Sequence, residues 1–309
     1  NLKLVKANTI FNVGIEPDIP DTILCPMCLT LFARKHLDED QYITFDHNPP
    51  TAMGGKAESG VLLCGPCNHR LGSELDAHLI RTLELGAFAQ GVTGAEVRGK
   101  LTFTGLPPLA VSYSNSASDS LAIRVANKAT NPAWLQPLEE LFMSRTKADV
   151  LSGTISVRGG RKTRSSLALL RIGYLQLFQL FGYGLLLMPP YFAIRQQLHE
   201  PDEPHLDSAW NLPPFFTTNL ADGVHLFEID EQIRGFAVAF QLRRNQRTTR
   251  HAIALPTVEA DVKSFYAQLG ALALDPVPRQ IRAKPIESRI ELWTDPVGCM
   301  ASLYHSFPH

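Results

Sequence analysis

The sequence has little charge and no excess of either sign. Among its 309 residues, Lys and Arg total 29 and Asp and Glu total 30, so the formal net charge is -1. This balance excludes a strong overall attraction to nucleic acid or to anionic lipid, and any such binding must come from local patches. Charged residues make up 19% of the chain and hydrophobic residues 45%, a composition that excludes disorder on a large scale.

The chain also lacks an internal repeat, and its first residues lack the apolar core of a secretory signal. We therefore expect a cytoplasmic protein. One apolar stretch, residues 166–188, is long enough to raise the question of a membrane span, but it contains Arg171, Gln176 and Gln179. An arginine near the centre of a span costs about 2.5 kcal/mol or more. We interpret the stretch as a buried helix and expect no membrane as a partner.

A length of 309 residues is typical of about two domains. We expect an α+β fold in which a module at residues 1–98 precedes a larger mixed α+β domain at residues 99–309. Strand-like segments at residues 224–229, 236–242 and 251–255 are joined by short polar turns. This pattern predicts an antiparallel meander in the second domain.

Prolines lead to two further predictions. Pro256 and Thr257 follow the last of these strand-like segments, and we expect a helix to begin there. Residues 189–214 contain six prolines, and we interpret them as a long exposed loop within the second domain.

The chain has only five cysteines, and four of them form two C-x-x-C pairs, Cys25 with Cys28 and Cys64 with Cys67. Secreted disulfide scaffolds do not have this pattern. Two such pairs at this separation are typical of a site in which four thiolates hold one tetrahedral zinc ion. The alternatives are a redox C-x-x-C motif, which lacks a flanking βαβ pattern here, and two chance pairs. The sequence therefore predicts a zinc site.

A second group of residues has the chemistry for phosphodiester hydrolysis, which requires a base for water and a divalent cation. Asp46 and His47 follow a strand-like segment at residues 41–45, and Asn68 follows the second cysteine pair. Adjacent strand side chains point to opposite faces, but a bend after the pair would let Asp46 bind a metal while His47 reaches water. Oxygens from Asp46 and Asn68 would leave most of a Mg²⁺ coordination sphere to water and phosphate, as that ion prefers.

The order and spacing of these motifs resemble the zinc-bearing HNH endonucleases and their ββα-metal fold. The resemblance covers residues 24–79, under a fifth of the chain. It implies a structural Zn²⁺ on the four cysteines, His47 as general base, and Asp46 with Asn68 as ligands of a catalytic Mg²⁺ or Mn²⁺. The motifs that carry it are Cys25-Pro26-Met27-Cys28, Asp46-His47-Asn48-Pro49-Pro50, Gly54-Gly55, Leu63-Cys64-Gly65-Pro66-Cys67-Asn68 and Gly72-Ser73-Glu74-Leu75-Asp76.

One position departs from the family's pattern, because the asparagine usual before the second cysteine pair is replaced near Ser59. That asparagine generally orients the histidine, so the departure implies weaker or conditional activity. His69 is an alternative ligand to Asn68, but neighbouring helical side chains point about 100° apart, so only one should face the site. Asp76 lies near the same helical face as Asn68 and is interpreted either as support for the site or as a solvated charge.

Two basic clusters lie in the expected second domain. One contains Arg158, Arg161, Lys162 and Arg164, and the other contains Arg243, Arg244, Arg247 and Arg250. We expect the second cluster to lie on a hairpin loop and to bind nucleic acid through its phosphates. A turn exposed to solvent is the favoured interpretation of the first.

Together these features favour a metal-dependent HNH endonuclease that hydrolyses phosphodiester bonds of DNA in restriction or phage defence. DNA is the expected partner, with RNA and a homodimer left open. The alternative is a non-catalytic zinc-knuckle module that binds nucleic acid or protein. The coincidence of Asp46, His47 and Asn68 with the cysteine pairs disfavours that alternative.

Overall fold

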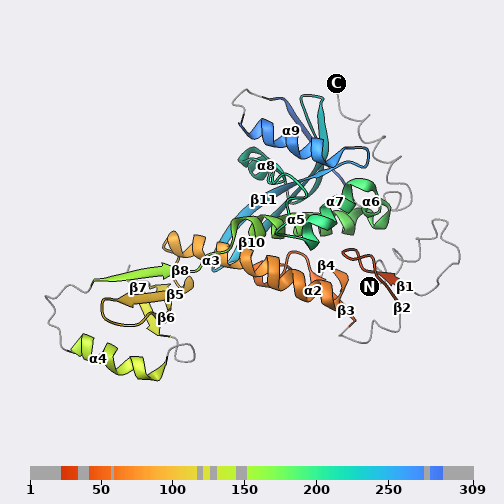
Figure 1. The fold of residues 1–309 in the computed structure, drawn as a ribbon. Helices are drawn as coiled ribbons and strands as arrows, with labels where there is room; N and C mark the ends of the chain where they lie inside the picture. Colours follow the sequence, from red (N-terminus) through yellow and green to blue (C-terminus); the bar gives the residue numbers. More distant parts are fainter. Residues whose placement is uncertain are drawn as a thin grey trace. The chain divides into compact units, whose positions relative to one another are not determined.

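The structure is a computed structural model. It describes residues 22–33, 42–56, 59–116, 121–125, 131–143, 152–274 and 279–287. In these residues the chain has the mixed α+β architecture that the sequence predicts, with helices and four small sheets (Figure 1). No helix in the described part of the chain is long and apolar enough to span a membrane.

The N-terminal region contains two short antiparallel strand pairs followed by a helix. The succession of β3, β4 and α2 is the ββα arrangement that the sequence predicts. Pro66 lies at the start of α2, where its missing N–H would have no helical partner in any case. The elements are β1 (Thr22–Leu24), β2 (Leu31–Ala33), β3 (Ile43–His47), β4 (Gly60–Cys64) and α2 (Gly65–Leu71).

The helical path continues from α2 through a π-helical turn at Gly72–Asp76 into α3 (Ala77–Ala89). Residues at steps of about four lie on one face of such a helix. The leucines spaced in this way are all buried, which places that face in the core. They are Leu71, Leu75, Leu79 and Leu83.

The chain divides into two compact units that are discontinuous in sequence. Unit 1 contains Asn1–Leu79, Lys162–Arg243 and Thr248–His309, and unit 2 contains Ile80–Arg161 and Arg244–Arg247. These units do not follow the expected division between residues 98 and 99. The physical reason is that the helices after residue 161 return to the N-terminal region and bind it, as described below.

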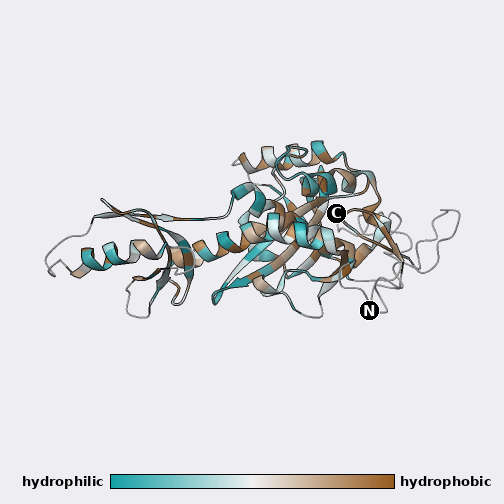
Figure 2. Ribbon diagram, turned by 60° about the horizontal axis from the view of Figure 1, so that its bottom comes forward, coloured by the Kyte–Doolittle hydropathy of each residue, from teal (hydrophilic) through white to brown (hydrophobic). Residues whose placement is uncertain are grey.

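Unit 1 contains a four-stranded sheet with the order β11-β10-β9-β12, which includes the expected meander. Figure 2 shows the change from hydrophobic to hydrophilic residues along β10 and β11 toward their connecting turn. The helix α5 (Lys162–Phe181) is buried along most of its length, as predicted for this apolar stretch. The other elements of unit 1 are β9 (Gly223–Ile229), β10 (Ile233–Arg244), β11 (Arg247–Pro256), β12 (Ile281–Pro285), α6 (Tyr183–Leu186), α7 (Pro189–His199), α8 (Pro214–Asn219) and α9 (Val262–Leu274).

The interpretation of residues 189–214 as one long exposed loop is wrong. The first part of this stretch is α7, and α8 begins at its end. Proline fits the first turn of a helix, where both helices carry it. Tyr191, Leu198 and Trp210 are buried, so the stretch contributes to the core of unit 1.

The helix expected to begin at Pro256 begins later, as α9. The N–H of Ser264 donates to Oδ1 of Asp261 at 2.7 Å. An aspartate that accepts such a bond caps the start of a helix, and this cap sets the first turn of α9.

Unit 2 is built on a four-stranded antiparallel sheet with the order β7-β6-β5-β8. One face of the sheet carries its core, in which Val97, Leu101, Val111 and Tyr113 cluster with Leu138. The elements are β5 (Glu96–Phe103), β6 (Leu109–Asn115), β7 (Leu121–Val125), α4 (Leu135–Met143) and β8 (Gly153–Val157).

Candidate zinc and nuclease site

The four paired cysteines converge on one point. The Sγ atoms of Cys25, Cys28, Cys64 and Cys67 all lie within 4.8 Å of one another, and those of Cys28 and Cys64 are 3.7 Å apart. Four sulfurs bound tetrahedrally to zinc at about 2.3 Å would lie roughly 3.8 Å apart. The donor set and its spacing therefore fit one structural Zn²⁺ ion.

Local backbone geometry holds each cysteine pair. After the first pair, Leu29 has a positive φ of 58°, and its N–H donates to the carbonyl oxygen of Cys25 at 2.8 Å. The second pair begins at the end of β4 and continues into the first turn of α2. A hydrogen bond with Cys28 lowers the pKa of Cys25 to about 7, and one with Cys25 lowers the pKa of Cys64 to about 7. Both shifts favour the thiolate form that binds metal, whereas hydrogen bonds with Cys25 and Cys28 raise the pKa of Cys67, so the thiols share protons in the absence of metal.

Side chains from α5, α6 and α7 bind the backbone around the first cysteine pair. The Tyr174 hydroxyl donates to the carbonyl oxygen of Pro26 at 2.8 Å, and Nε2 of His199 lies 2.8 Å from the carbonyl oxygen of Met27. The Tyr183 hydroxyl also donates to a carbonyl oxygen there. These contacts join segments far apart in sequence, and they explain why unit 1 includes both.

The strand β3 presents Asp46 and His47 to opposite faces, because successive strand side chains alternate. Asp46 is buried, with 7% of its surface exposed. His47 is half-buried, and its ring meets the ring of Phe45 edge-on at a centroid distance of 5.2 Å. The bend expected to turn both residues toward one metal and one water is therefore not formed in this structure.

The carboxylate of Asp46 is paired with a buried arginine of α5. Arg171 has no exposed surface; its Nη2 donates to Oδ2 of Asp46, and its Nη1 donates to Oδ2 of Asp76 at 2.5 Å. Burial raises the pKa of Asp46 to about 6 and also raises that of Asp76, while Arg171 opposes both shifts. One guanidinium offsets only one of the two carboxylates, so these three residues, the Asp46 cluster, favour the retention of a proton.

Several polar atoms of this region are buried and have no hydrogen-bond partner among the described residues. They include Oδ1 of Asp76, Nε of Arg171 and Oδ1 of Asn48. Asn48 is fully buried, and its Nδ2 donates to the carbonyl oxygen of Ile172 at 3.1 Å. Buried polar atoms are usually paired. These atoms of the interface between β3 and α5 could therefore accept or donate further hydrogen bonds.

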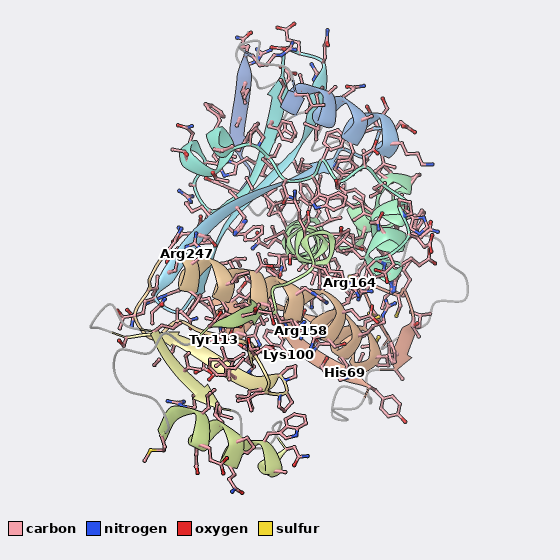
Figure 3. All side chains as sticks on the ribbon, turned by 60° about the vertical axis from the view of Figure 1, so that its left-hand side comes forward. His69, Lys100, Tyr113, Arg158, Arg164 and Arg247 are labelled. Carbon is pink, nitrogen blue, oxygen red and sulfur yellow. The ribbon has the colours of Figure 1, made fainter. Side chains whose placement is uncertain are left out.

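Asn68 lines an open pocket of about 440 Å³. Its Nδ2 donates to Oγ1 of Thr44 at 3.0 Å, which leaves its Oδ1 as a free ligand atom. His69, labelled in Figure 3, lines the same pocket. Both neighbours therefore reach the pocket, although helix geometry led us to expect only one. The lining residues are Thr44, Gly65, Asn68, His69, Gly72 and Ser73.

Ser59 binds the backbone directly after His47. Its hydroxyl donates to the carbonyl oxygen of Asn48 at 2.5 Å, and the N–H of Asn48 donates to the carbonyl oxygen of Ser59 at 2.9 Å. Ser59 thus fixes the chain where β3 ends. Ser59 contacts the backbone beside His47. The asparagine usual at this position in the family is instead expected to orient the histidine ring.

The arginines of the second basic cluster lie on strands, and the expected loop is wrong. β10 ends at Arg244 and β11 begins at Arg247, and the two residues between them have φ angles of 48° and 62°. Two-residue turns of this kind match the twist of a hairpin. Nη2 of Arg244 lies 2.6 Å from Oε1 of Glu84, and Nη2 of Arg250 lies 3.0 Å from Oδ1 of Asp222. Two of the four cations are therefore already paired with carboxylates.

The region from the first cysteine pair to α3 is similar to a known family. Residues 25–84 match a family model for HNH endonucleases. This HNH module contains both cysteine pairs and the segment from Asp46 to Asp76, and it ends before α5. No curated protein and no solved structure matches the chain.

Sequence reasoning missed the part that Arg171 plays beside the HNH module. The signal was present, because a lone arginine in an apolar helix must either reach water or find buried acidic partners. The partners are Asp46 and Asp76, which lie 125 and 95 positions away in the sequence. Nothing local to Arg171 indicates which acids these are.

Proposed function

We propose that this protein is a metal-dependent HNH endonuclease that hydrolyses phosphodiester bonds of DNA, with a role in restriction or phage defence. The observation that carries the proposal is the HNH match over residues 25–84, which contains four convergent thiols together with His47 and Asn68. A closed tetrathiolate site supplies folding energy to a small module. Such a module can then hold a base and a cation in fixed positions for hydrolysis.

In this proposal His47 is the general base that takes a proton from the attacking water. Asp46 and Asn68 hold a divalent cation, Mg²⁺ or Mn²⁺, which would stabilise negative charge on the phosphate. Arg171 binds Oδ2 of Asp46 and Thr44 binds Nδ2 of Asn68. One oxygen of each ligand side chain is therefore left for the cation, which supports the proposal.

Three further residues support this site. Asp76 shares Arg171 with Asp46 and so fixes the position of the guanidinium. Ser59 holds the backbone that follows His47. His69 lines the pocket beside Asn68 and is the alternative ligand.

The test is nicking of a supercoiled plasmid with Mg²⁺ or Mn²⁺ by wild type and His47→Ala. A general base contributes about 10²–10⁴ to a rate, so His47→Ala should cleave at least about 100-fold more slowly with unchanged zinc content. The matched control is His205→Ala, because His205 pairs with Glu200 and both lie outside the residues that match the HNH family. Equal cleavage by wild type and His47→Ala, with contaminating nuclease excluded, would refute the assignment of the base.

A non-catalytic role in binding nucleic acid or protein is the second candidate. It is favoured by one observation, namely that Asp46 is ion-paired with Arg171 while His47 lies on the other face of β3. This candidate predicts DNA binding without cleavage in Mg²⁺ and in Mn²⁺. Cleavage that depends on His47 would reject it.

A further inference from the structure

The sheet of unit 2 has two faces of opposite character. Val97, Leu101, Val111 and Tyr113 point to the core face, where they are buried together. Because strand side chains alternate, the residues between them point to the other face. Those residues are exposed or half-buried, so this second face is open.

Basic residues of β5 and β7 and the residue that follows β8 line up across the open face. The register pairs Arg98 of β5 with Ser112 of β6, and Ser112 with Arg124 of β7. On the other side of β5, the N–H of Arg158 donates to the carbonyl oxygen of Arg98 at 3.1 Å. Neighbouring strands lie about 4.8 Å apart, so the row from Arg124 to Arg158 spans roughly 14 Å.

Lys100 lies two residues after Arg98 on the same face of β5, and Figure 3 labels it together with Arg158. We call Arg98, Lys100, Arg124 and Arg158 the basic sheet face. All four residues are exposed, and none is in an ion pair with a described residue. Two arginines of the β10–β11 hairpin differ in this respect, because Arg244 and Arg250 have carboxylate partners. The sheet face therefore presents net positive charge in a chain whose net charge is -1.

The side chains among these cations are small. They are Thr102, Ala110, Ser112, Ser114, Ala122, Thr154 and Ser156, with Glu96 as the acidic residue on this face. Small side chains let a partner approach the backbone closely, and serine and threonine hydroxyls bind phosphate oxygens. The described face carries no aromatic residue. Proteins that bind single strands through a sheet usually stack bases on aromatic side chains, so this face does not fit an unpaired strand.

We propose that the basic sheet face binds the phosphate backbone of duplex DNA and supplies affinity to the protein. The inference rests on the proposed function for the choice of DNA as the partner. It places a DNA-binding surface in unit 2, outside the residues that match the HNH family. The contacts are with phosphates, so binding should depend weakly on base sequence and strongly on salt.

The test measures binding of a labelled DNA duplex by the full-length protein without Mg²⁺, at several salt concentrations. The variant carries Arg98→Ala, Lys100→Ala, Arg124→Ala and Arg158→Ala. Each neutralised phosphate contributes about 0.9 to the slope of log affinity against log salt, so the slope should flatten by about 3 to 4 units. Thermal unfolding should be near wild type, because exposed positions outside the core tolerate alanine.

A charge-matched pair of variants checks the location. Lys100→Glu and Lys263→Glu each change the charge by two, and both lysines are exposed. Lys100→Glu should weaken duplex binding at least 10-fold, and Lys263→Glu should change it less than twofold. An unchanged salt slope in the fourfold variant, equal effects of the two glutamates, or tighter binding of the single strand than of the duplex would each overturn the proposal.

The binding assay separates this inference from the proposed nuclease function. If wild type binds duplex through these residues but does not cleave it with Mg²⁺ or Mn²⁺, the nuclease proposal fails and the binding face stands. If wild type cleaves DNA in a His47-dependent way while the fourfold variant binds and cleaves like wild type, the binding face fails and the nuclease proposal stands.

Discussion

The group of four cysteines and the Asp46 cluster lie beside the same two strands but are assembled from different parts of the chain. All four cysteines that could hold zinc belong to the HNH module. The Asp46 cluster instead depends on Arg171, which belongs to a helix outside the family match. The HNH module therefore contains all the residues of its candidate zinc site, whereas the environment of its candidate catalytic residues is set by the rest of unit 1.

The largest effect is expected when one of the four candidate zinc ligands is removed. Cys64→Ser should lose the metal and unfold the HNH module, because zinc-finger peptides gain about 10–16 kcal/mol from structural zinc. Metal analysis of wild type should find about one zinc per chain. The control is Cys299→Ser, which changes the fifth cysteine, outside the described residues. Wild-type protein that is folded, contains no zinc and has four freely reactive thiols would contradict the prediction.

The sequence predicted what depends on local spacing. The convergence of both C-x-x-C pairs and the strand β3 follow from patterns a few residues long. The meander of unit 1 could also be predicted, because short polar turns join adjacent strands. The assumption that failed was that prolines mark a loop, since Pro189 and Pro190 instead begin the buried helix α7.

The division into units could not be predicted, because it depends on contacts between segments that are far apart in the sequence. The expected boundary at residue 98 assumed that domains are continuous, whereas α5 returns to the HNH module through Arg171 and Tyr174. The pairing of two hairpin arginines with carboxylates could not be predicted either. Glu84 and Asp222 are far from Arg244 and Arg250 in sequence, so no local pattern shows the pairing.

A second test measures how strongly the Asp46 cluster depends on Arg171 of α5. Arg171→Met should lower the free energy of unfolding by about 3–5 kcal/mol, because it leaves two buried carboxylates without their cation. Urea unfolding measures this effect. Arg234→Met is the control: Arg234 pairs with the buried Glu228 but is half exposed, and Glu228 keeps Arg282 as a partner. Arg234→Met should therefore lower the free energy of unfolding by no more than about 1 kcal/mol. Equal losses in the two variants would show that Arg171 is no more important than a surface cation.

The smallest expected effect is a dependence of stability on pH that arises from the Asp46 cluster. Burial raises the pKa of Asp46 in the folded chain from 3.8 to about 6. Between about pH 4 and pH 6 the folded chain therefore retains a proton that the unfolded chain has released, so the free energy of unfolding falls as the pH rises. The fall ends above about pH 6 and amounts to at most about 3 kcal/mol, at 1.36 kcal/mol per unit of pKa. Asp46→Asn cannot titrate at this position, so its urea unfolding should lack this part of the pH dependence. Parallel curves for wild type and Asp46→Asn would mean that Arg171 keeps Asp46 ionised throughout this range, with its carboxylate charge already in place for a cation.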